Sequence, residues 1–298
     1  MDNLKIIEEK RLKKYNEYKK LRNKGILFLI PAILFFVLII IHAAFAIGGI
    51  ILLIPSFLFF SKAFKELKSF RDIIKKELVL TLLKEQFEDV SYEPKGSIPV
   101  SRIVATGMVK RPDRSTAEDY IKGSYKGVGF EVCDINFKER VEHRDSKGNV
   151  TVSYETYFKG RWYIYSFERT FKEELKIAEG RGYGMKKRNL VKIDTESIEF
   201  NKKFAIYATS QEYGFYHITS SMLEKLLELE KLHRGSILYY YVANELHIGV
   251  NDRKDYMEVS IKTPINEESL KSFLSDIELI PAIINELRLD SSKFKKTL

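Results

Sequence analysis

The sequence predicts an α+β fold class: an N-terminal transmembrane helical hairpin followed by a soluble antiparallel-sheet-rich domain with a few helices. Two observations lead to this prediction. An uncharged apolar stretch of 36 residues, from Gly25 to Phe60, stands near the start of the chain. Behind it, short runs of alternating apolar residues cluster together instead of alternating with helices. That order favours an antiparallel sheet over a doubly wound parallel fold.

The apolar stretch is too long for one membrane-spanning helix, which needs about 20 residues, and short for two full-length ones. The segment from His42 to Ala44 and the Gly48-Gly49 pair offer a bend in its middle. We therefore expect two short helices, 26–41 and 45–60, joined as a hairpin. Two alternatives stay open, which are signal-peptidase cleavage at Ala44–Ala46 and a re-entrant hairpin that does not reach the far leaflet.

The net charge of +9 is concentrated beside the apolar stretch. Residues 1–24 carry +5, residues 62–77 carry +3 and residues 78–298 carry only +1. Lys and Arg next to spanning segments favour the cytoplasmic side of a membrane. We therefore expect a cell-membrane protein with two spans, whose N-terminus and soluble domain are both cytoplasmic.

The same charge distribution narrows the range of partners. A nucleic-acid-binding domain carries a basic face on the domain itself, and the near-neutral region 78–298 argues against one. The expected partners are the lipid bilayer and a protein or lipid of unknown identity.

The chain divides into four expected parts. Residues 1–24 form a basic cytosolic helix, which is either attracted to anionic lipid or a solvated flank. Residues 25–60 form the transmembrane hairpin. Residues 61–90 form a stalk helix with apolar residues at three- and four-residue spacing. Residues 91–298 form the soluble α+β domain, with a candidate internal boundary near 180–189.

The strands of the soluble domain are expected where apolar and polar residues alternate. Glu131–Val141, Val150–Phe158 and Arg161–Glu168 surround the turn cluster Asp145–Asn149 and predict an antiparallel meander with one covered and one wet face. Further strands are expected at 190–193, 204–208, 237–242, 246–250 and 256–261.

Two helices are expected in the C-terminal third of the chain. The first is 220–232, where Ser221 and Glu224 have the spacing of a capping box. The second is 267–287, with an interruption at Pro281 because proline removes a helical hydrogen bond.

Several stretches resemble a known family. They are Tyr120–Gly127 (YIKGSYKG), Phe158–Arg161 (FKGR) and Glu196–Phe200 (ESIEF), the last followed by Phe204–Tyr207 and the helix 221–232. Together they resemble the bacterial membrane protein family of unknown function 3137 (DUF3137), over about residues 115–290 plus the hairpin in front. The resemblance implies a bacterial membrane protein with a β-rich domain. It brings no activity, cofactor or site residues.

No specific chemical motif is present. No two of the five histidines stand three or four residues apart, and H-E-x-x-H and G-x-S-x-G are absent. The single cysteine, Cys133, is expected in the core; it cannot form an intrachain disulfide and fits a reducing compartment. We therefore expect no catalytic residues, no metal site and no cofactor.

Four cations around a glycine-rich loop are the one candidate contact site. Arg181, Lys186, Lys187 and Arg188 lie in or beside Gly180–Gly184, which lacks the Lys-Ser/Thr of a phosphate-binding P-loop. They are candidates for contact with an anion or a lipid headgroup. The plainer interpretation is a solvated turn.

The aromatic residues at Trp162–Tyr165 and Tyr239–Tyr241 are interpreted as packing across the sheet and not as a ligand site. The sequence therefore favours a membrane-anchored cytosolic module of unknown function that binds or scaffolds a protein or lipid partner without catalysis. The alternative is a membrane-bound enzyme with an unrecognised site. A polar pocket holding a strongly perturbed ionisable pair would favour the enzyme.

Overall fold

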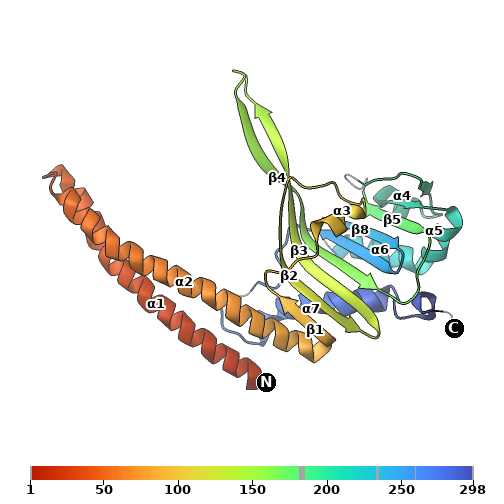
Figure 1. The fold of residues 1–298 in the computed structure, drawn as a ribbon, viewed down its shortest axis with the longest axis horizontal. Coiled ribbons are helices and arrows are strands. Elements are labelled where there is room, and N and C mark those ends of the chain that lie inside the picture. The colour runs from red at the N-terminus through yellow and green to blue at the C-terminus, as the bar shows by residue number, and fades with distance from the viewer. Residues whose placement is uncertain (1, 181–184, 233–234, 259, 297–298) are drawn as a thin grey trace. The chain divides into compact units, whose positions relative to one another are not determined.

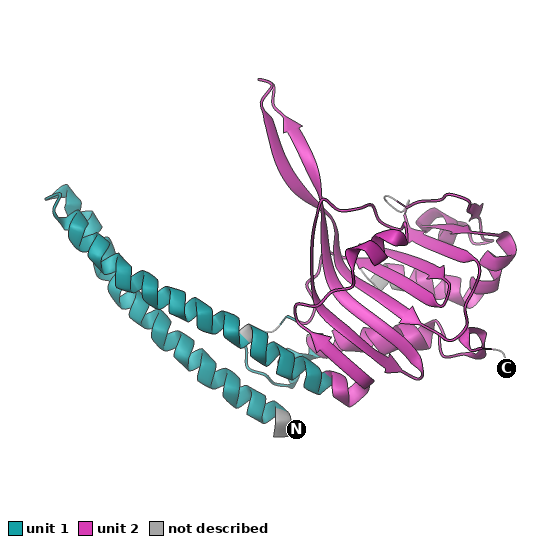
Figure 2. Ribbon diagram, in the orientation of Figure 1, with its two compact units in different colours: residues 1–82, 258–272 teal, residues 83–257, 273–298 magenta. Residues whose placement is uncertain are grey.

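The computed structural model describes residues 2–180, 185–232, 235–258 and 260–296. The chain divides into two compact units (Figure 2). The first contains residues 1–82 and 258–272, and the second contains residues 83–257 and 273–298.

Two long helices dominate the first unit (Figure 1). Helix α1 (Asp2–Val37) is followed by a short 3-10 helix η1 (Leu38–Ile40), and helix α2 runs from Phe45 to Gln86. The chain therefore turns at residues 41–44, where the sequence predicts a bend. Helix α2 ends at Gln86 and not at Val90, because residues 88–93 pair as a strand.

The two helices pack side by side and antiparallel. The Lys14 ammonium pairs with the Glu66 carboxylate at 2.7 Å. Farther along, the buried Ser56 hydroxyl donates to the Gly25 carbonyl at 3.0 Å. As the residue number rises along α1, the number of its partner on α2 falls, so the helices run in opposite directions.

The N-terminal part of α1 is packed and not a fully solvated flank. Arg11 is buried and donates to the Ile261 carbonyl at 2.5 Å and to the Glu8 carboxylate at 2.6 Å. The Glu8 carboxylate in turn accepts from the Ile265 backbone N–H at 2.8 Å. The segment 260–265 thus covers the start of α1, which sequence spacing alone does not indicate.

The second unit is built on one nine-stranded sheet in the order β1-β2-β3-β4-β9-β8-β5-β7-β6. Every described pairing is antiparallel, as predicted. The strands are β1 (Glu88–Glu93), β2 (Arg114–Tyr125), β3 (Val128–Arg144), β4 (Val150–Ser166), β5 (Glu174–Glu179), β6 (Val191–Ile193), β7 (Phe204–Ala208), β8 (Ser236–Val242) and β9 (Glu245–Asn251).

Helices flank this sheet. They are α3 (Val100–Ala105), α4 (Ile198–Lys203), α5 (Gln211–His217), α6 (Ser220–Leu232), α7 (Glu267–Glu286) and the 3-10 helix η2 (Ser292–Phe294). The predicted span of α6 is confirmed, but its cap is Thr219, whose hydroxyl accepts from the Met222 N–H at 3.3 Å. The prediction that Ser221 caps it is wrong.

The centre of the sheet is covered on both faces. Four consecutive residues of β4, Trp162–Tyr165, are at most 1% exposed, and Tyr239–Tyr241 of β8 are buried as well. One face packs on α3 in a core that includes Cys133, and the other meets α7, where the Tyr165 hydroxyl donates to the Ile280 carbonyl. The expectation of one wet face is therefore wrong here, whereas the expected aromatic packing is confirmed.

Two further predictions are wrong. The described residues of the segment 256–261, which are 256–258 and 260–261, do not form a strand. The backbone N–H groups of Tyr256 and Met257 bond to side-chain carboxylates instead, and Met257 has a φ of 50°. Helix α7 runs through Pro281 without interruption. Among the described residues, sequence patterns also missed β1, β2, β5, α3, α4 and α5.

The close approach of β9 to β4 can be tested by substitution of a glycine. A Cβ at Gly249 of β9 would lie 2.6 Å from the Trp162 ring, which is fully buried and has no room to move. Gly249→Ala is expected to lower the free energy of unfolding by about 1–3 kcal/mol. At Gly129 of β3 the nearest atom would be 3.7 Å away, so Gly129→Ala is the control. Equal urea midpoints for the two purified variants in detergent would contradict this packing.

Candidate functional site

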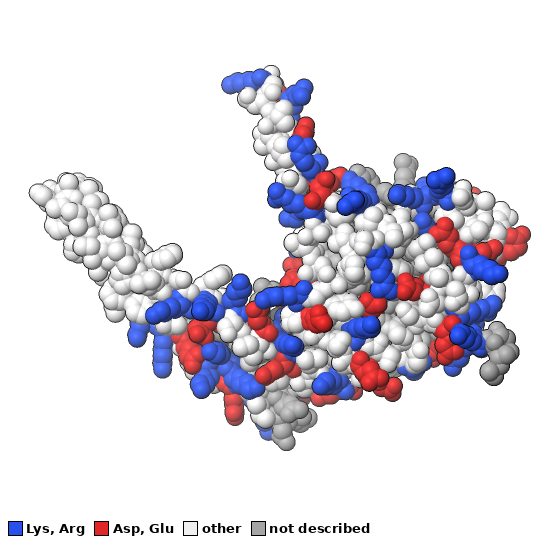
Figure 3. Space-filling view, viewed as in Figure 1, with Lys and Arg blue, Asp and Glu red and all other residues white. Residues whose placement is uncertain are grey.

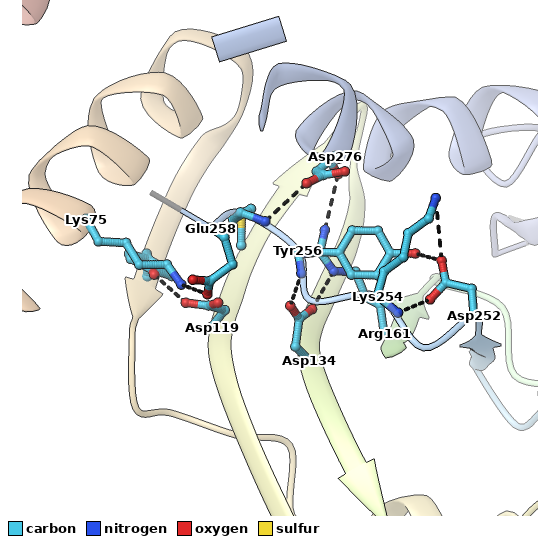
Figure 4. A network of polar contacts seen from close by, with 11 residues as sticks. Lys75, Asp119, Asp134, Arg161, Asp252, Lys254, Tyr256, Glu258 and Asp276 are labelled. Carbon is cyan, nitrogen blue, oxygen red and sulfur yellow. Dashed lines mark hydrogen bonds and ion pairs between the residues drawn. The ribbon is translucent and has the colours of Figure 1, made fainter. Parts of the chain in front are cut away.

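A buried ion pair lies between neighbouring strands of the second unit (Figure 4). Asp134 of β3 and Arg161 of β4 are direct partners in the strand register. The Arg161 Nε donates to Asp134 Oδ1 at 2.7 Å, and the Arg161 side chain is 0% exposed. A charge this deep is tolerated only when it is paired and hydrogen-bonded.

Further contacts surround this pair. The Tyr256 N–H donates to the second oxygen of Asp134 at 3.1 Å, and the Arg161 guanidinium lies 4.1 Å from the centre of the Tyr256 ring. Arg161 Nη1 also donates to the Asp276 carbonyl at 3.2 Å, while the Asp276 carboxylate accepts from the Met257 N–H at 3.1 Å. The pair therefore fastens segment 252–257 and helix α7 to the sheet.

The electrostatic environment of the pair keeps the Arg161 side chain charged and does not favour transfer of its proton. Burial by itself lowers the pKa of Arg161, but the adjacent Asp134 carboxylate, Tyr163 and Asp276 together outweigh burial and raise that pKa above its ordinary value. Burial raises the pKa of the Asp276 carboxyl. Arg161 thus stays a cation at every physiological pH.

A small polar cavity of about 200 Å³ adjoins the pair. Its wall is formed by β2, β3, the middle of β4 and the loop after β9. The lining residues are Thr116, Ala117, Glu118, Asp134, Ile135, Asn136, Lys159, Gly160, Lys254 and Asp255. The volume lies below the ~300–1,000 Å³ of ordinary small-molecule sites.

The polar groups of this cavity are largely engaged with one another. Both Asp134 oxygens accept hydrogen bonds, and Lys159 pairs with Asp255 at 2.9 Å. The side-chain oxygen of Asn136, Oδ1, accepts a hydrogen bond from the Thr156 hydroxyl at 3.1 Å.

A second polar network lies around α3. Arg102 bridges the carboxylates of Glu131 on β3, at 2.8 Å, and Glu245 on β9, at 2.6 Å. His247 Nδ1 accepts from the Trp162 indole N–H at 3.4 Å, so Nε2 carries the proton and donates to Glu245 at 3.0 Å. The hydrogen bond from His247 and the Arg102 guanidinium lower the pKa of Glu245 to about 2. This network joins three strands and a helix and is satisfied internally.

His217 is a buried residue whose two ring nitrogens both lack a hydrogen-bond partner. It packs among aromatic rings, including Phe171 at 4.9 Å and Tyr213 at 4.6 Å. Burial, together with the charges of Lys293 and Arg169, lowers the pKa of His217 to about 3. The ring is therefore neutral, and no group of three potential metal ligands occurs among the described residues.

The predicted anion or lipid contact is only partly visible. Arg181 lies outside the described residues, as do 182–184. Lys186, Lys187 and Arg188 are exposed, and within the described part of the chain none of them pairs with a carboxylate. Two hydrogen bonds to the backbone of Lys186 anchor this loop: the Lys186 N–H donates to the Gly107 carbonyl at 2.6 Å, and the Lys176 ammonium donates to the Lys186 carbonyl at 3.1 Å.

One family model matches part of the chain. Residues 156–289 match the model of a family described as "Protein of unknown function (DUF3137)", which confirms the resemblance seen in the sequence. The stretch Tyr120–Gly127 lies before the matched region. No curated protein matches the sequence.

One solved structure is similar, the crystal structure of the mycobacterial trehalose monomycolate transport factor A, TtfA. The match has a TM-score of 0.36 and 10% sequence identity, and it covers 66% of this chain and 88% of that chain. A similarity this low supports no statement about function.

The buried pair predicts a large effect of removing one partner. Arg161→Met leaves the Asp134 carboxylate buried without its cation and is expected to cost about 3–5 kcal/mol of the free energy of unfolding. The double variant Arg161→Met with Asp134→Asn is expected to regain part of that loss. Lys159→Met, which removes the more exposed pair with Asp255, is expected to cost less than about 1 kcal/mol. Urea unfolding of the purified chain measures all three, and equal costs for the two single variants would contradict a structural role for Arg161.

Proposed function

We propose that α1 and α2 span a membrane as a two-helix hairpin and that the sheet-bearing unit is a cytoplasmic module that binds a protein or lipid partner without catalysis. The observation that carries this proposal is the apolar surface of the helix pair. In the apolar part of each helix only 11% of the residues are buried. Exposed side chains there include Leu27, Ile30, Leu34, Ile47, Ile51 and Phe57, all at least half exposed.

Physical chemistry favours lipid as the partner of this surface. Removing one such side chain from water gains about 1.5–3 kcal/mol, and a helix satisfies its own backbone hydrogen bonds within hydrocarbon. The part of the helix pair that holds residues 25–60 carries no charge and is white in Figure 3, whereas Lys, Arg, Asp and Glu cover the other end of the pair. An uncharged segment followed by a charged one is typical of a helix that leaves a bilayer.

The orientation follows from the basic flanks. Residues 1–24 and 62–77 carry +5 and +3, and both adjoin the uncharged segment. The preference of Lys and Arg for the cytoplasmic side supports a topology with both ends of the hairpin in the cytoplasm.

The preference for binding over catalysis rests on the second unit. Its cavity is small, and the ionisable groups beside it stabilise one another in ion pairs. The raised pKa of Arg161 keeps a charge in place and supplies no acid or base. These features support a rigid module more than a reaction centre.

Protease protection tests the orientation. The full chain with a C-terminal epitope is expressed in bacteria, and intact spheroplasts are treated with protease before and after lysis. The epitope is expected to survive until lysis, because the basic flanks hold the second unit inside. A periplasmic protein and a cytoplasmic protein serve as controls for integrity. Loss of the epitope from intact spheroplasts would contradict the topology and favour extracellular ligands.

The exposed cations of the loop favour a second candidate, which is that the partner is an anionic lipid headgroup. Lys186, Lys187 and Arg188 are adjacent, exposed and without a carboxylate partner in the described residues. Each cation near an anionic surface contributes about 1 kcal/mol of attraction.

Charge reversal tests this candidate on a fragment that begins at Ser61 and so lacks the apolar segment. Reversing all three cations to Glu is expected to weaken binding to phosphatidylserine vesicles by on the order of 100-fold. The control reverses Lys172, Lys202 and Lys295, which are also exposed but dispersed, so that the change in net charge is identical. Equal binding by the two variants would exclude a specific headgroup contact at the loop.

A further inference from the structure

Strands β3 and β4 extend beyond the rest of the sheet as a two-stranded arm (Figures 1 and 2). Strand β2 pairs with β3 only as far as Lys138, and β9 pairs with β4 only from Arg161. Between them, β3 and β4 pair with each other out to Arg144 and Val150. We define the arm as residues 139–156. Two strands alone are marginally stable in water, so an arm of this length calls for a partner.

The backbone groups that face outward on the arm follow from the hydrogen bonds at its base. The Lys138 carbonyl and the Arg140 N–H both bond to Asp113, on the outer side of β3. Two residues that face each other in an antiparallel pair direct their backbone N–H and C=O groups in the same sense, either both toward the partner strand or both away from it. Arg140 faces Tyr154, and Glu142 faces Val152. Val150, Val152 and Tyr154 therefore present their N–H and C=O groups along the outer edge of β4.

The two edges of the arm differ in chemistry. The β3 edge carries a charge at Glu139, Arg140, Glu142 and Arg144, and Asp113 already occupies the Arg140 N–H. Charged edges of this kind resist the addition of another strand. The β4 edge reads Val-Thr-Val-Ser-Tyr from Val150 to Tyr154, with exposed fractions of 48% at Val150 and 43% at Val152. This edge is uncharged, β-branched and open, which favours strand addition.

We propose that the β4 edge of the arm pairs with the same edge of a second copy of this chain, antiparallel and about a two-fold axis at Val152. In this register Val152 faces Val152 of the other copy, and Val150 faces its Tyr154. Pairs of β-branched and aromatic residues across strands are favourable. The nearest charge, Glu155, faces the neutral Asn149, so no like charges oppose each other. The two arms then form one four-stranded sheet.

The register is self-complementary, which is the reason to assign a second copy and not an unrelated strand. A two-fold pairing matches the same patch on both subunits. Shifting the axis to Tyr154 would bring the two Glu155 carboxylates to neighbouring positions on one face, which is unfavourable. The Val152 register avoids that repulsion and buries the exposed valines.

Cysteine cross-linking tests the register on the full chain in detergent. The native thiol of Cys133 is 0% exposed, so an introduced cysteine is the reactive one. Val152→Cys is expected to form a reducible covalent dimer under mild oxidation. The control is Glu142→Cys, which lies directly across the arm on the β3 edge. The Val152→Cys dimer should form at least about tenfold faster, because facing Cα atoms lie ~5.5 Å apart, within disulfide reach.

Light scattering on the unmodified chain provides a second measurement that does not depend on disulfide geometry. A dimer is expected, and Val152→Lys is expected to shift it to monomer, because the two-fold axis places the two ammonium groups together. Within one arm the new lysine faces Glu142 across the strands, so the arm itself tolerates it. A monomeric unmodified chain, or equal cross-linking at residues 142 and 152, would overturn the proposal.

Discussion

The ion pair between Arg161 and Asp134 is the interaction on which the second unit depends. An arginine with 0% exposure needs a partner for its charge, and the groups that contact Arg161 come from three separate parts of the chain. Asp134 comes from the neighbouring strand, the Tyr256 ring from the loop after β9, and the Asp276 carbonyl from α7. The pair therefore determines where the loop crosses the sheet and where α7 lies. The face of the sheet that meets α7 is covered as a consequence.

The first unit depends on a different constraint, which is the exclusion of apolar surface from water. Its helices satisfy their own backbone bonds, and they contact each other through pairs such as Ser56 with Gly25 and Phe28 with Phe59. Most of their leucine, isoleucine and phenylalanine side chains between residues 26 and 58 remain exposed. A membrane removes this surface from water without any further contact within the chain. The buried ion pair and the uncharged helices together support a rigid module on an anchor.

Sequence patterns predicted the elements whose signal is local. The bend between the apolar helices, the hairpin around Asp145–Asn149 and helix α6 all follow from residues that are close in sequence. The segment 256–261 shows the limit of this reasoning. Its sequence YMEVSI alternates in the way that is typical of a strand. However, the carboxylates of Asp134 and Asp276 accept hydrogen bonds from the backbone N–H groups that would otherwise pair with a neighbouring strand. No local pattern records a partner 122 residues away.

The candidate site was less predictable than the fold. Asp134 and Arg161 are 27 residues apart and stand among apolar neighbours. A charged residue at such a position of a strand is normally assigned to the solvent-exposed face. The predicted interruption at Pro281 was wrong for a related reason. Contacts with the sheet hold helix α7 in place around this residue, for example the hydrogen bond from the Tyr165 hydroxyl to the Ile280 carbonyl. Cys133 was predicted correctly because an apolar strand face has one outcome, burial.

The measurement that tests the membrane anchor most directly is photolabelling from within the bilayer. The full chain is reconstituted with a lipid that carries a photoreactive group at the end of an acyl chain, and the adducts are mapped by mass spectrometry. Adducts are expected on both helices between residues 26 and 58, and none between residues 2 and 20 or between 62 and 86. Adducts on only one helix, or none in the uncharged segment, would contradict a two-span anchor.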